Sequence, residues 1–462
     1  MTETAFSTLK LHADLLNNLV SLGYKNMTPI QAQSLPFILS GKDVIAQGKT
    51  GSGKTAAFSL GLLEKLNVKH FRIQSLVLCP TRELADQVAK EIRRFARSIH
   101  NIKVLTLCGG APFGPQIGSL EHGAHIIVGT PGRVEEHIRK GTLNLENLVT
   151  FVLDEADRML DMGFEPALDA IVAKMPQKRQ TLLFSATYPE QIQSIAARYM
   201  TKPAIVEASE KHNNSSIQQY KFKLENKIER ITALRLLLLH YHPESALVFC
   251  NTKKETQEVA NALSTGGFSA LALHGDLDQK DRDKTLVRFT NKSASILVAT
   301  DVAARGLDID ALDLIINYHI AHDAEVHIHR IGRTGRAGSQ GIACTLYEDK
   351  ESHKMEKLEH FLEQNIESAP LPSLHILNEP AYSPTMVSLQ IDAGKKQKIR
   401  PGDILGALTG ANGIAGKDVG KIQIFDNWAF VAVSQTTAKS ALEKLENGKL
   451  KGRTIRVRRI RD

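Results

Sequence analysis

Two short strings combine the residue types needed to bind and hydrolyse a nucleoside triphosphate. The first is GKTGSGKT, from Gly48 to Thr55, and the second is DEAD, from Asp154 to Asp157. Each follows a run of apolar residues that is typical of a buried strand. Either string alone carries an appreciable risk of a chance match, but both in this order fit one nucleotide-binding domain. The pair therefore predicts a nucleoside-triphosphatase.

The first string predicts a phosphate-binding loop. Gly51 and Gly53 let backbone N–H groups converge on phosphate oxygens, and a helix that starts here directs its positive end at the anion. Lys54 would neutralise the β- and γ-phosphates, and the Thr55 hydroxyl would be a ligand of Mg²⁺. A glycine-rich turn before an ordinary helix is the alternative. The predicted nucleotide-binding loop comprises Gly48, Lys49, Thr50, Gly51, Ser52, Gly53, Lys54 and Thr55.

The second string predicts the hydrolytic carboxylates. Asp154, at a strand end, is the expected Mg²⁺ ligand, and Glu155 is the candidate that orients and deprotonates the attacking water. Asp157 is expected to organise neighbouring loops. The alternative, an exposed acidic turn, is weak beside a phosphate loop. The expected cofactors are therefore ATP and Mg²⁺.

Phosphoryl transfer also needs positive charge where negative charge develops. The string HRIGRTGR offers Arg330, Arg333 and Arg336, far along the chain from both nucleotide motifs. If a cleft closes on ATP, Arg333 and Arg336 could act as arginine fingers, which contribute roughly 10³–10⁵ in rate. A basic loop that binds only nucleic acid is the alternative.

Two sets of strands must position these residues. Short runs rich in Val, Ile and Leu alternate with helical stretches on either side of the polar string SEKHNNSS, which predicts two α/β domains with parallel sheets and a cleft between them. Polar loops follow nearly every run, where open α/β sheets place their ligands. The first set is Asp43–Gln47, Ser75–Cys79, Lys103–Leu107, His125–Val128, Phe151–Leu153 and Thr181–Phe184. The second is Ala246–Cys250, Ala270–Leu273, Ile296–Ala299, Leu314–Asn317 and Ile342–Leu346.

The last part of the chain has a different character. Four prolines between 368 and 385 predict a linker. Beyond it, the sequence predicts the order β-α-β-β-α-β of RNA-recognition modules. The predicted elements are a strand at MVSLQI, a helix from about Pro401, two strands around an Asp-Asn turn, a helix through Gln435–Leu445 and a final strand at RTIRVRRI. The predicted boundaries are 1–208 and 217–366 for the two α/β domains, 367–383 for the linker and 384–462 for the small α+β domain.

The positive charge of the chain is confined to this last domain. The net charge is +8, yet residues 1–383 carry 43 basic and 43 acidic residues, whereas residues 384–462 carry 15 and 7. A neutral body with a basic end predicts that the end binds a polyanion. Charge alone leaves open the alternative of a solvated basic face.

Composition narrows the class of protein further. No apolar run reaches the roughly 18–20 residues that a bilayer span needs, and the N-terminal residues lack the pattern of a secretory signal. Cys79, Cys108, Cys250 and Cys344 have no metal spacing and lie mostly in strand-like runs, so we expect reduced core thiols. We expect a cytoplasmic protein, in monomeric form and without a membrane partner.

The motifs together resemble those of the DEAD-box RNA helicases, in the order of that family and over about residues 6–340. The resemblance implies two RecA-like domains and RNA-stimulated ATP hydrolysis that drives local, non-processive duplex opening. It assigns adenine recognition to Gln31 with Phe6 upstream, and the coupling of hydrolysis to strand opening to Ser185 and Thr187. By the same resemblance, Asp308 contacts the ribose, and RNA is contacted by Thr81, Arg82, Gly110, Thr130, Arg133 and Thr300.

The C-terminal domain is similar to the RNA-binding domain of the DbpA group of bacterial DEAD-box proteins, which implies 23S ribosomal RNA and large-subunit precursors as partners. Trp428 and Phe430 occupy positions at which RNA-recognition modules stack bases, but Asp426 replaces the usual basic residue and the first strand lacks an aromatic. Plain sheet packing is the alternative for both rings. A second expected RNA surface comprises Lys451, Arg453, Arg456 and Arg458.

Two other functions are alternatives to that of an RNA helicase. The first is an ATP-gated RNA clamp or assembly scaffold without physiological unwinding, against which the intact Glu155 and Arg333/Arg336 set argues. The second is a DNA-directed translocating helicase. The sequence Asp-Glu-Ala-Asp at 154–157 and the segment around Gln31 argue against it.

Overall fold

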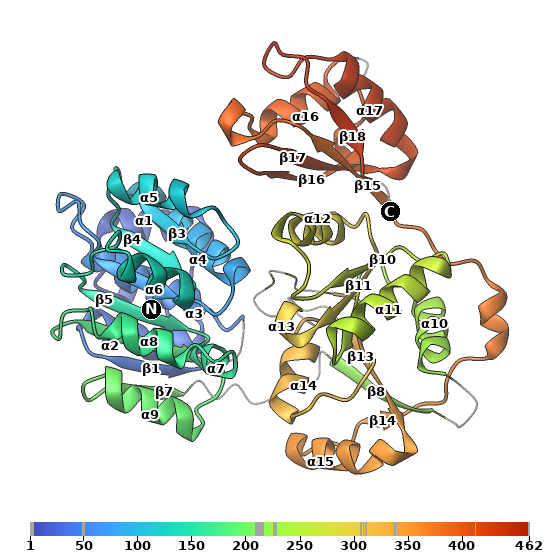
Figure 1. Ribbon diagram of the computed structural model, residues 1–462, viewed down its shortest axis with the longest axis horizontal. Helices are drawn as coiled ribbons and strands as arrows, with labels where there is room; N and C mark the ends of the chain where they lie inside the picture. The colour runs from blue at the N-terminus through green and yellow to red at the C-terminus, as the bar shows by residue number, and fades with distance from the viewer. Residues whose placement is uncertain are drawn as a thin grey trace. The chain divides into compact units, whose positions relative to one another are not determined.

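The fold is known from a computed structural model, which describes residues 4–48, 51–207, 217–224, 229–304, 307, 309, 312–335, 340–411 and 413–460. The chain divides into two compact units, with the break at about residue 213 (Figure 1). The first contains one parallel sheet, and the second contains another parallel sheet and a small antiparallel one. In the described residues, no helix is both long and apolar enough to cross a membrane.

The first sheet has seven parallel strands in the order β3-β4-β2-β5-β6-β1-β7. All six strands predicted for the first domain are present, and β7 was missed because its short sequence is half exposed. The strands are β1 (Val44–Gln47), β2 (Ser75–Leu78), β3 (Val104–Leu107), β4 (Ile126–Gly129), β5 (Thr150–Asp154), β6 (Gln180–Ser185) and β7 (Ala204–Glu207).

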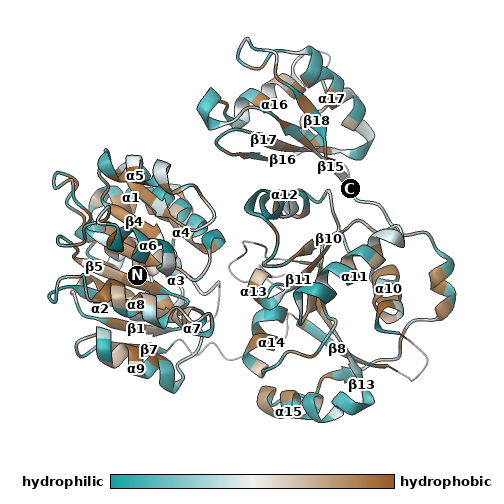
Figure 2. Cartoon of the chain, viewed as in Figure 1, coloured by the Kyte–Doolittle hydropathy of each residue, from teal (hydrophilic) through white to brown (hydrophobic). Residues whose placement is uncertain are grey.

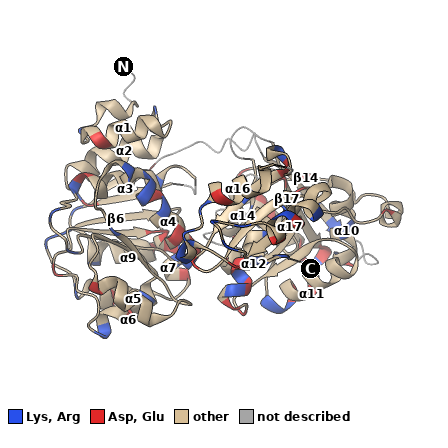
Figure 3. Cartoon of the chain, turned by 90° about the horizontal axis from the view of Figure 1, so that it is seen from above, with Lys and Arg blue, Asp and Glu red and all other residues tan. Residues whose placement is uncertain are grey.

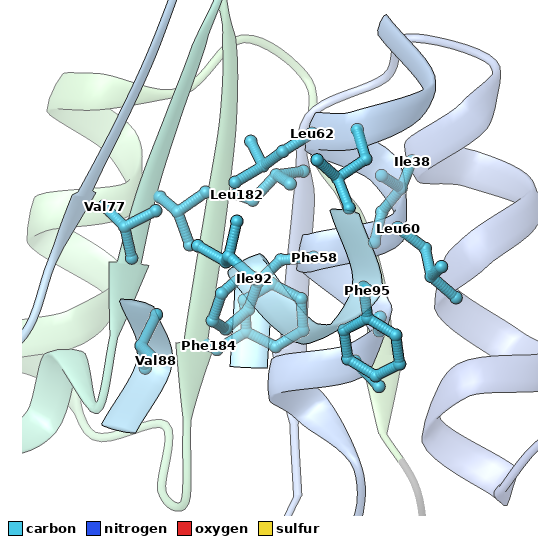
Figure 4. Close-up of a cluster of buried hydrophobic side chains, with 14 of the residues drawn as sticks. Ile38, Phe58, Leu60, Leu62, Val77, Val88, Ile92, Phe95, Leu182 and Phe184 are labelled. Atoms are coloured by element: carbon cyan, nitrogen blue, oxygen red, sulfur yellow. The ribbon is translucent and has the colours of Figure 1, made fainter. Parts of the chain in front are cut away.

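Helices cover both faces of this sheet, and the middle residues of its central strands are apolar and appear brown in Figure 2. Alternate residues of β2 enter different cores: Val77 lies in one cluster, and Leu76 and Leu78 lie in the other. The rings of Phe58 and Phe184 meet in the first cluster at 5.3 Å between centroids (Figure 4). The helices are α1 (Ala13–Ser21), α2 (Pro29–Leu39), α3 (Lys54–Lys65), α4 (Arg82–Phe95), α5 (Phe113–Glu121), α6 (Pro131–Arg139), α7 (Ala156–Asp161), α8 (Glu165–Val172) and α9 (Glu190–Tyr199).

The second parallel sheet repeats this arrangement in the order β10-β11-β9-β12-β13-β8-β14. The five predicted strands are present, and β8 was missed because polar residues alternate along it. The strands are β8 (Ile217–Leu224), β9 (Ala246–Cys250), β10 (Ala270–Leu273), β11 (Ile296–Thr300), β12 (Leu314–Asn317), β13 (Gly341–Glu348) and β14 (Glu367–Ser368). The helices are α10 (Arg230–Tyr241), α11 (Lys253–Thr265), α12 (Gln279–Thr290), α13 (Asp301–Ala304), α14 (Ala324–Ile331) and α15 (Ser352–Leu362).

The proline-rich segment predicted as a linker is packed against the core of this second domain. Its first residues form β14, and Leu371, Ile376 and Leu377 contact the core cluster. Tyr382 meets Phe268 edge to face at 5.8 Å between ring centroids. Prolines prevent regular structure here, but the apolar side chains between them still bury surface, so this segment is not a free spacer.

The small sheet confirms the predicted β-α-β-β-α-β order. Its strands β15 (Met386–Ile391), β16 (Val419–Ile424), β17 (Ala429–Ser434) and β18 (Val457–Arg459) are antiparallel in the order β16-β17-β15-β18. Helices α16 (Pro401–Thr409) and α17 (Ala438–Asn447) pack with the sheet around one core. The final strand is shorter than RTIRVRRI predicts. The four cysteines are free and buried, as expected.

Candidate ATP and RNA site

Three adjacent strands of the first sheet bring the nucleotide motifs together. β1, β6 and β5 are neighbours, with Gln47 paired to Ser185 and Asp154 paired to Phe184. Because the strands are parallel, the phosphate loop after β1 and the DEAD string at the end of β5 meet at one sheet edge. The loop is tied to β6 by a hydrogen bond from Gly48 N to Ser185 O of 3.0 Å.

The phosphate loop requires glycine at position 53 for two reasons. Gly53 has φ +96°, in the left-handed region, and immediately precedes α3. A Cβ built on it would lie 2.3 Å from the Gln31 Nε2, which donates to Gly53 O at 3.1 Å. The Gln31 Oε1 accepts from Thr28 N at 2.9 Å, so one amide joins the start of α2 to the phosphate loop. Lys49 and Thr50 lie outside the described residues.

Lys54 and Asp154 are buried side chains of opposite charge that interact electrostatically. Lys54 is 6% exposed, and its ammonium donates to Gly48 O. Burial lowers the pKa of Lys54, opposed by the carboxylates of Asp154 and Glu155. Burial raises the pKa of Asp154 to about 7, and Glu155 adds to the rise while Lys54 opposes it. A bound phosphate would stabilise the buried charge of Lys54, and a cation would stabilise the ionised form of Asp154.

Glu155 adopts a conformation that is rare for a side chain other than glycine. Its φ is +54° and ψ +53°, where it precedes α7. Such backbone strain is typical of functional positions that the surroundings hold in place. The Arg158 Nε lies 3.3 Å from the Glu155 Oε2, and both side chains are almost fully buried. In Figure 3 acidic and basic segments both lie at α7.

Asp157 joins the DEAD string to the SAT string at the end of β6. Its Oδ2 accepts from the backbone N–H groups of Ala186 and Thr187 at 3.2 and 3.3 Å, and from the Thr187 hydroxyl at 3.3 Å. Its Oδ1 accepts from Arg158 N at 3.0 Å. The expected organising role of Asp157 therefore has a direct geometric basis. Ser185 is 1% exposed, and its hydroxyl oxygen accepts from Thr187 N at 3.4 Å.

Three other predicted nucleotide residues differ in exposure: Phe6 is buried, whereas Ser52 and Thr55 are partly exposed. Phe6 is 2% exposed and packs edge to face on Tyr24 at 6.2 Å between ring centroids. Its ring therefore supports the segment that precedes Gln31 from within the core. The side chains of Ser52 and Thr55 are partly exposed. Contact of these residues with a nucleotide stays a prediction.

The predicted RNA residues of the first domain lie at the carboxyl ends of β2, β4 and β3, which continue the same sheet edge. Thr81 caps α4 by accepting from Leu84 N at 3.3 Å, and the Arg82 Nε lies 3.9 Å from Asp86. Gly110 is exposed with φ +74°. Thr130 precedes α6, and Arg133 donates to Ala111 O at 2.9 Å.

In the second domain, Arg330 is a buried structural hub. It is 1% exposed and forms a bidentate pair with Asp301, with distances of 2.7 and 2.8 Å. The same guanidinium donates to Asn317 at 3.2 Å, to His319 O at 2.8 Å and to Asn251 at 3.2 Å. Among the three arginines of HRIGRTGR, this one is committed to holding β9, β12, α13 and α14 together.

The other predicted residues of this domain are only partly described. Arg333 is 5% exposed, and its carbonyl accepts from Leu312 N at 3.1 Å. Thr300 ends β11, and its hydroxyl oxygen accepts from Ala303 N at 3.3 Å. Arg336 and Asp308 lie outside the described residues. The roles of Arg333 and Arg336 as arginine fingers therefore stay a prediction.

In the small domain, the two candidate stacking rings differ in exposure. Phe430 is 1% exposed and meets Phe425 edge to face at 5.6 Å, whereas Trp428 is partly exposed in the β16–β17 turn. Base stacking on Phe430 would require its ring to be uncovered. Among the basic candidates, Lys451 pairs with Asp403 at 3.2 Å and Arg458 with Asp392 at 3.3 Å, and Arg453 and Arg456 have exposed side chains.

Sequence reasoning missed several side chains that hold these loops. Arg158 lies three residues after Glu155, and this i,i+3 spacing of opposite charges is the signal in the sequence that could have predicted their ion pair. His137 follows Arg133 by one helical turn, and its full burial has no signal in the sequence. In the described residues, no group of three or more His, Cys, Asp or Glu side chains forms a metal cluster.

Comparisons with known proteins agree with this arrangement. Three family models match: DEAD/DEAH box helicase over residues 28–195, helicase conserved C-terminal domain over 226–338, and DbpA RNA binding domain over 388–459. The ATP-dependent RNA helicase DbpA of Escherichia coli (strain K12) is 52% identical over 459 residues, which are 99% of this chain and 100% of that protein. The DEAD-box ATP-dependent RNA helicase CshA of Geobacillus kaustophilus (strain HTA426) is 44% identical over 80% of this chain and 79% of its own length.

Solved structures give the same result. The structure of S. cerevisiae Dbp5 bound to RNA and ADP BeF3 aligns with a TM-score of 0.70 at 29% identity, over 79% of this chain and 96% of that chain. The two parallel-sheet domains are thus RecA-like, and the match to the third family model covers the small antiparallel sheet. The chain belongs to the DEAD-box ATP-dependent RNA helicases and carries a DbpA-type RNA-binding domain.

Proposed function

We propose that this helicase opens short RNA duplexes locally and non-processively, and that its C-terminal domain targets it to structured 23S ribosomal RNA during large-subunit assembly. The proposal places it in the cytoplasm as a monomer. The observation that carries it is the shared sheet edge of the first domain, where ATP motifs follow β1, β5 and β6, and RNA motifs follow β2, β3 and β4.

In the proposed reaction, the chain's own groups bind phosphate and prepare water. Lys54 neutralises the β- and γ-phosphates, and Glu155 orients the attacking water and accepts its proton. The hydrogen bonds from Thr187 to Asp157 relay a change at the nucleotide to the SAT string. Arg333 and Arg336 stabilise the charge that develops on the transferred phosphoryl group.

A magnesium ion fits the donor set of the first domain. Mg²⁺ prefers oxygen ligands and usually takes one or two carboxylates together with substrate phosphates. Asp154 offers a buried carboxylate whose pKa is raised to about 7 by burial, and Thr55 begins the adjacent helix with a hydroxyl. Asp154 and Thr55 would hold the ion, which would screen phosphate charge.

Replacement of Gln31 by Ala is expected to weaken the preference for ATP over GTP. The side-chain amide can pair with the N6/N7 edge of adenine while keeping its bonds to Thr28 and Gly53, because each amide atom has further hydrogen-bonding capacity. Loss of one bidentate contact is worth about 1–3 kcal/mol of base discrimination. The ratio of kcat/KM values for the two nucleotides checks this, and an unchanged ratio would remove the adenine-reading role.

Removal of the residues after Ser383 is expected to leave weak RNA-dependent ATPase activity and to abolish selective, salt-sensitive RNA anchoring. The two RecA-like domains keep their own cores, whereas all of the net positive charge is lost. Affinities for 23S fragments and for unrelated RNA should be compared across a salt series. A full-length variant with Arg453→Gln and Arg456→Gln is the matched control, since it keeps the fold and should lose only part of the salt dependence.

Three experiments separate this proposal from its alternatives. If the truncated protein chooses among RNAs as the full chain does, the targeting role of the C-terminal domain is wrong. Crosslinking to cellular RNA identifies the nucleotides that the C-terminal domain contacts. Crosslinks that lie only outside 23S RNA would contradict the proposed target. RNA-stimulated hydrolysis without strand release from any short duplex would favour the clamp without physiological unwinding.

A further inference from the structure

A cluster of side chains joins the two outermost RNA loops of the first domain. One loop follows β3 and contains Gly109 and Gly110, and the other follows β4 and leads into α6. The helices α5 and α6 lie in the same part of the first unit as β3 and β4 (Figure 1). The cluster, here called the β3–β4 clamp, consists of Phe113, Gln116, Arg133, His137 and Thr142.

The clamp has a buried polar chain. The Gln116 Nε2 donates to Cys108 O at 3.0 Å, which fixes its Oε1 as the acceptor that lies 3.0 Å from the His137 Nε2. His137 must therefore carry a hydrogen on Nε2, and in the neutral ring its Nδ1 is an acceptor. This Nδ1 lies 2.8 Å from the Thr142 hydroxyl, whose single hydrogen can go either to Nδ1 or to His137 O at 3.1 Å. Burial lowers the pKa of His137, and the Arg133 charge adds to this, which favours the same neutral form.

The clamp also has an aromatic face. The Phe113 ring stacks on His137 with 4.1 Å between centroids and 17° between planes. Arg133 lies 5.5 Å and Lys140 4.0 Å from the centroid of the Phe113 ring, within cation–π range. The same Arg133 donates to Ala111 O at 2.9 Å, next to the glycine pair.

These contacts reach the glycine loop at both ends. Gln116 holds Cys108 before the two glycines, and Arg133 holds Ala111 after them. Between these points, Gly109 and Gly110 are exposed and have no side chains with which to pack. A glycine segment loses more conformational freedom on ordering than other residues, so its shape depends on the anchors.

We propose that His137 is a positioning residue for RNA binding, which acts through Gln116 and Phe113 to keep the Gly109–Gly110 loop preformed beside α6. The inference rests on the proposed RNA role of this loop. His137 is 0% exposed, so it does not touch RNA itself. RNA then binds without ordering the loop, and preorganisation of this kind raises affinity rather than the rate of the chemical step.

In the full-length protein, His137→Ala is expected to raise the RNA concentration that half-stimulates ATP hydrolysis by about tenfold. This is the conformational entropy cost of ordering about one backbone residue of the loop when RNA binds. The maximal rate and the KM for ATP should change little. Hydrogen exchange of the peptide spanning 108–113, measured without RNA, should become faster. Phe113→Leu should act in the same direction, and His137→Gln, which restores a donor to Gln116, should recover part of the effect.

His122→Ala is the matched control, because His122 is an exposed histidine of the neighbouring helix end and bonds only locally to Gly118 O. Unchanged exchange of the loop in His137→Ala would overturn the inference. A lower maximal rate and melting temperature with no shift in half-saturating RNA would also overturn it, since that is the result of a purely structural role. Faster exchange with unchanged RNA affinity would instead remove the proposed RNA role of the loop and leave its anchoring by His137 in place.

Discussion

Purified Glu155→Gln protein is expected to hydrolyse ATP about 10²–10⁴-fold more slowly at saturating RNA, the usual contribution of a general base. Glutamine keeps the size of the side chain but cannot accept the proton of the attacking water. Glutamine keeps an oxygen that can accept from the Arg158 guanidinium, whose Nε lies 3.3 Å from the Glu155 Oε2, so we expect the variant to fold. The measurement is RNA-stimulated phosphate release, together with ATP affinity by direct binding.

ATP binding distinguishes this result from a general failure of the site. Glu155→Gln should still bind ATP, whereas Lys54→Ala should lose affinity because it removes the buried ammonium that would meet the phosphates. Glu121→Gln, at an exposed glutamate of α5, is the control and should turn over normally. Near-normal hydrolysis by Glu155→Gln would exclude the proposed base.

Replacement of Arg330 by Ala is expected to lower the free energy of unfolding of the second RecA-like domain by about 3–5 kcal/mol, as when one partner of a buried ion pair is removed. The change leaves Asp301 without its bidentate partner, and it deprives Asn317, Asn251 and the His319 carbonyl of a donor. Hydrogen exchange of peptides from β9 and β12 across a denaturant series measures the loss in the full chain.

Arg198→Ala is the matched control for that experiment. Its ion pairs with Glu165 and Asp169 lie on the surface of the first unit, where such pairs contribute about 0–1 kcal/mol. Arg330→Lys should recover only part of the stability, since an ammonium cannot reproduce the planar fork of donors. Equal stability of Arg330→Ala and the parent protein would show that the hydrogen bonds of Arg330 do not stabilise the second RecA-like domain.

The parts of the fold that could be predicted are those in which a local pattern and its physical cause coincide. The central strands are buried on both faces, so their apolar runs stand out, and the phosphate loop needs Gly53 for backbone geometry that only glycine supplies cheaply. The DEAD string follows such a strand. Sequence reasoning therefore placed Lys54, Asp154 and Asp157 at one sheet edge, where the structure brings them together.

The parts that could not be predicted depend on contacts between distant residues. Strand β8, which lies between β13 and the two-residue edge strand β14, alternates polar and apolar residues and lacks the continuous apolar run of its neighbours. Phe430 is 1% exposed in the fold, which its place in the sequence does not show, and the proposed role of His137 depends on Gln116, 21 positions away. The sequence assigned no role to Arg330 beyond its place in HRIGRTGR, and its structural role depends on Asp301 and Asn317, which are distant in the chain.

The packed proline segment sets how far the RNA-binding domain can reach. Tyr382 is held against Phe268 of the second domain, and Thr385 is already held by the small domain through its carbonyl, which accepts from Gln435 N at 2.9 Å. Only Ser383 and Pro384 lie between, so the tether spans at most about 11 Å. RNA captured by the C-terminal domain thus stays at a high local concentration near the motor. The duplex that is opened should therefore be one that lies next to the anchoring site rather than one elsewhere on the same RNA.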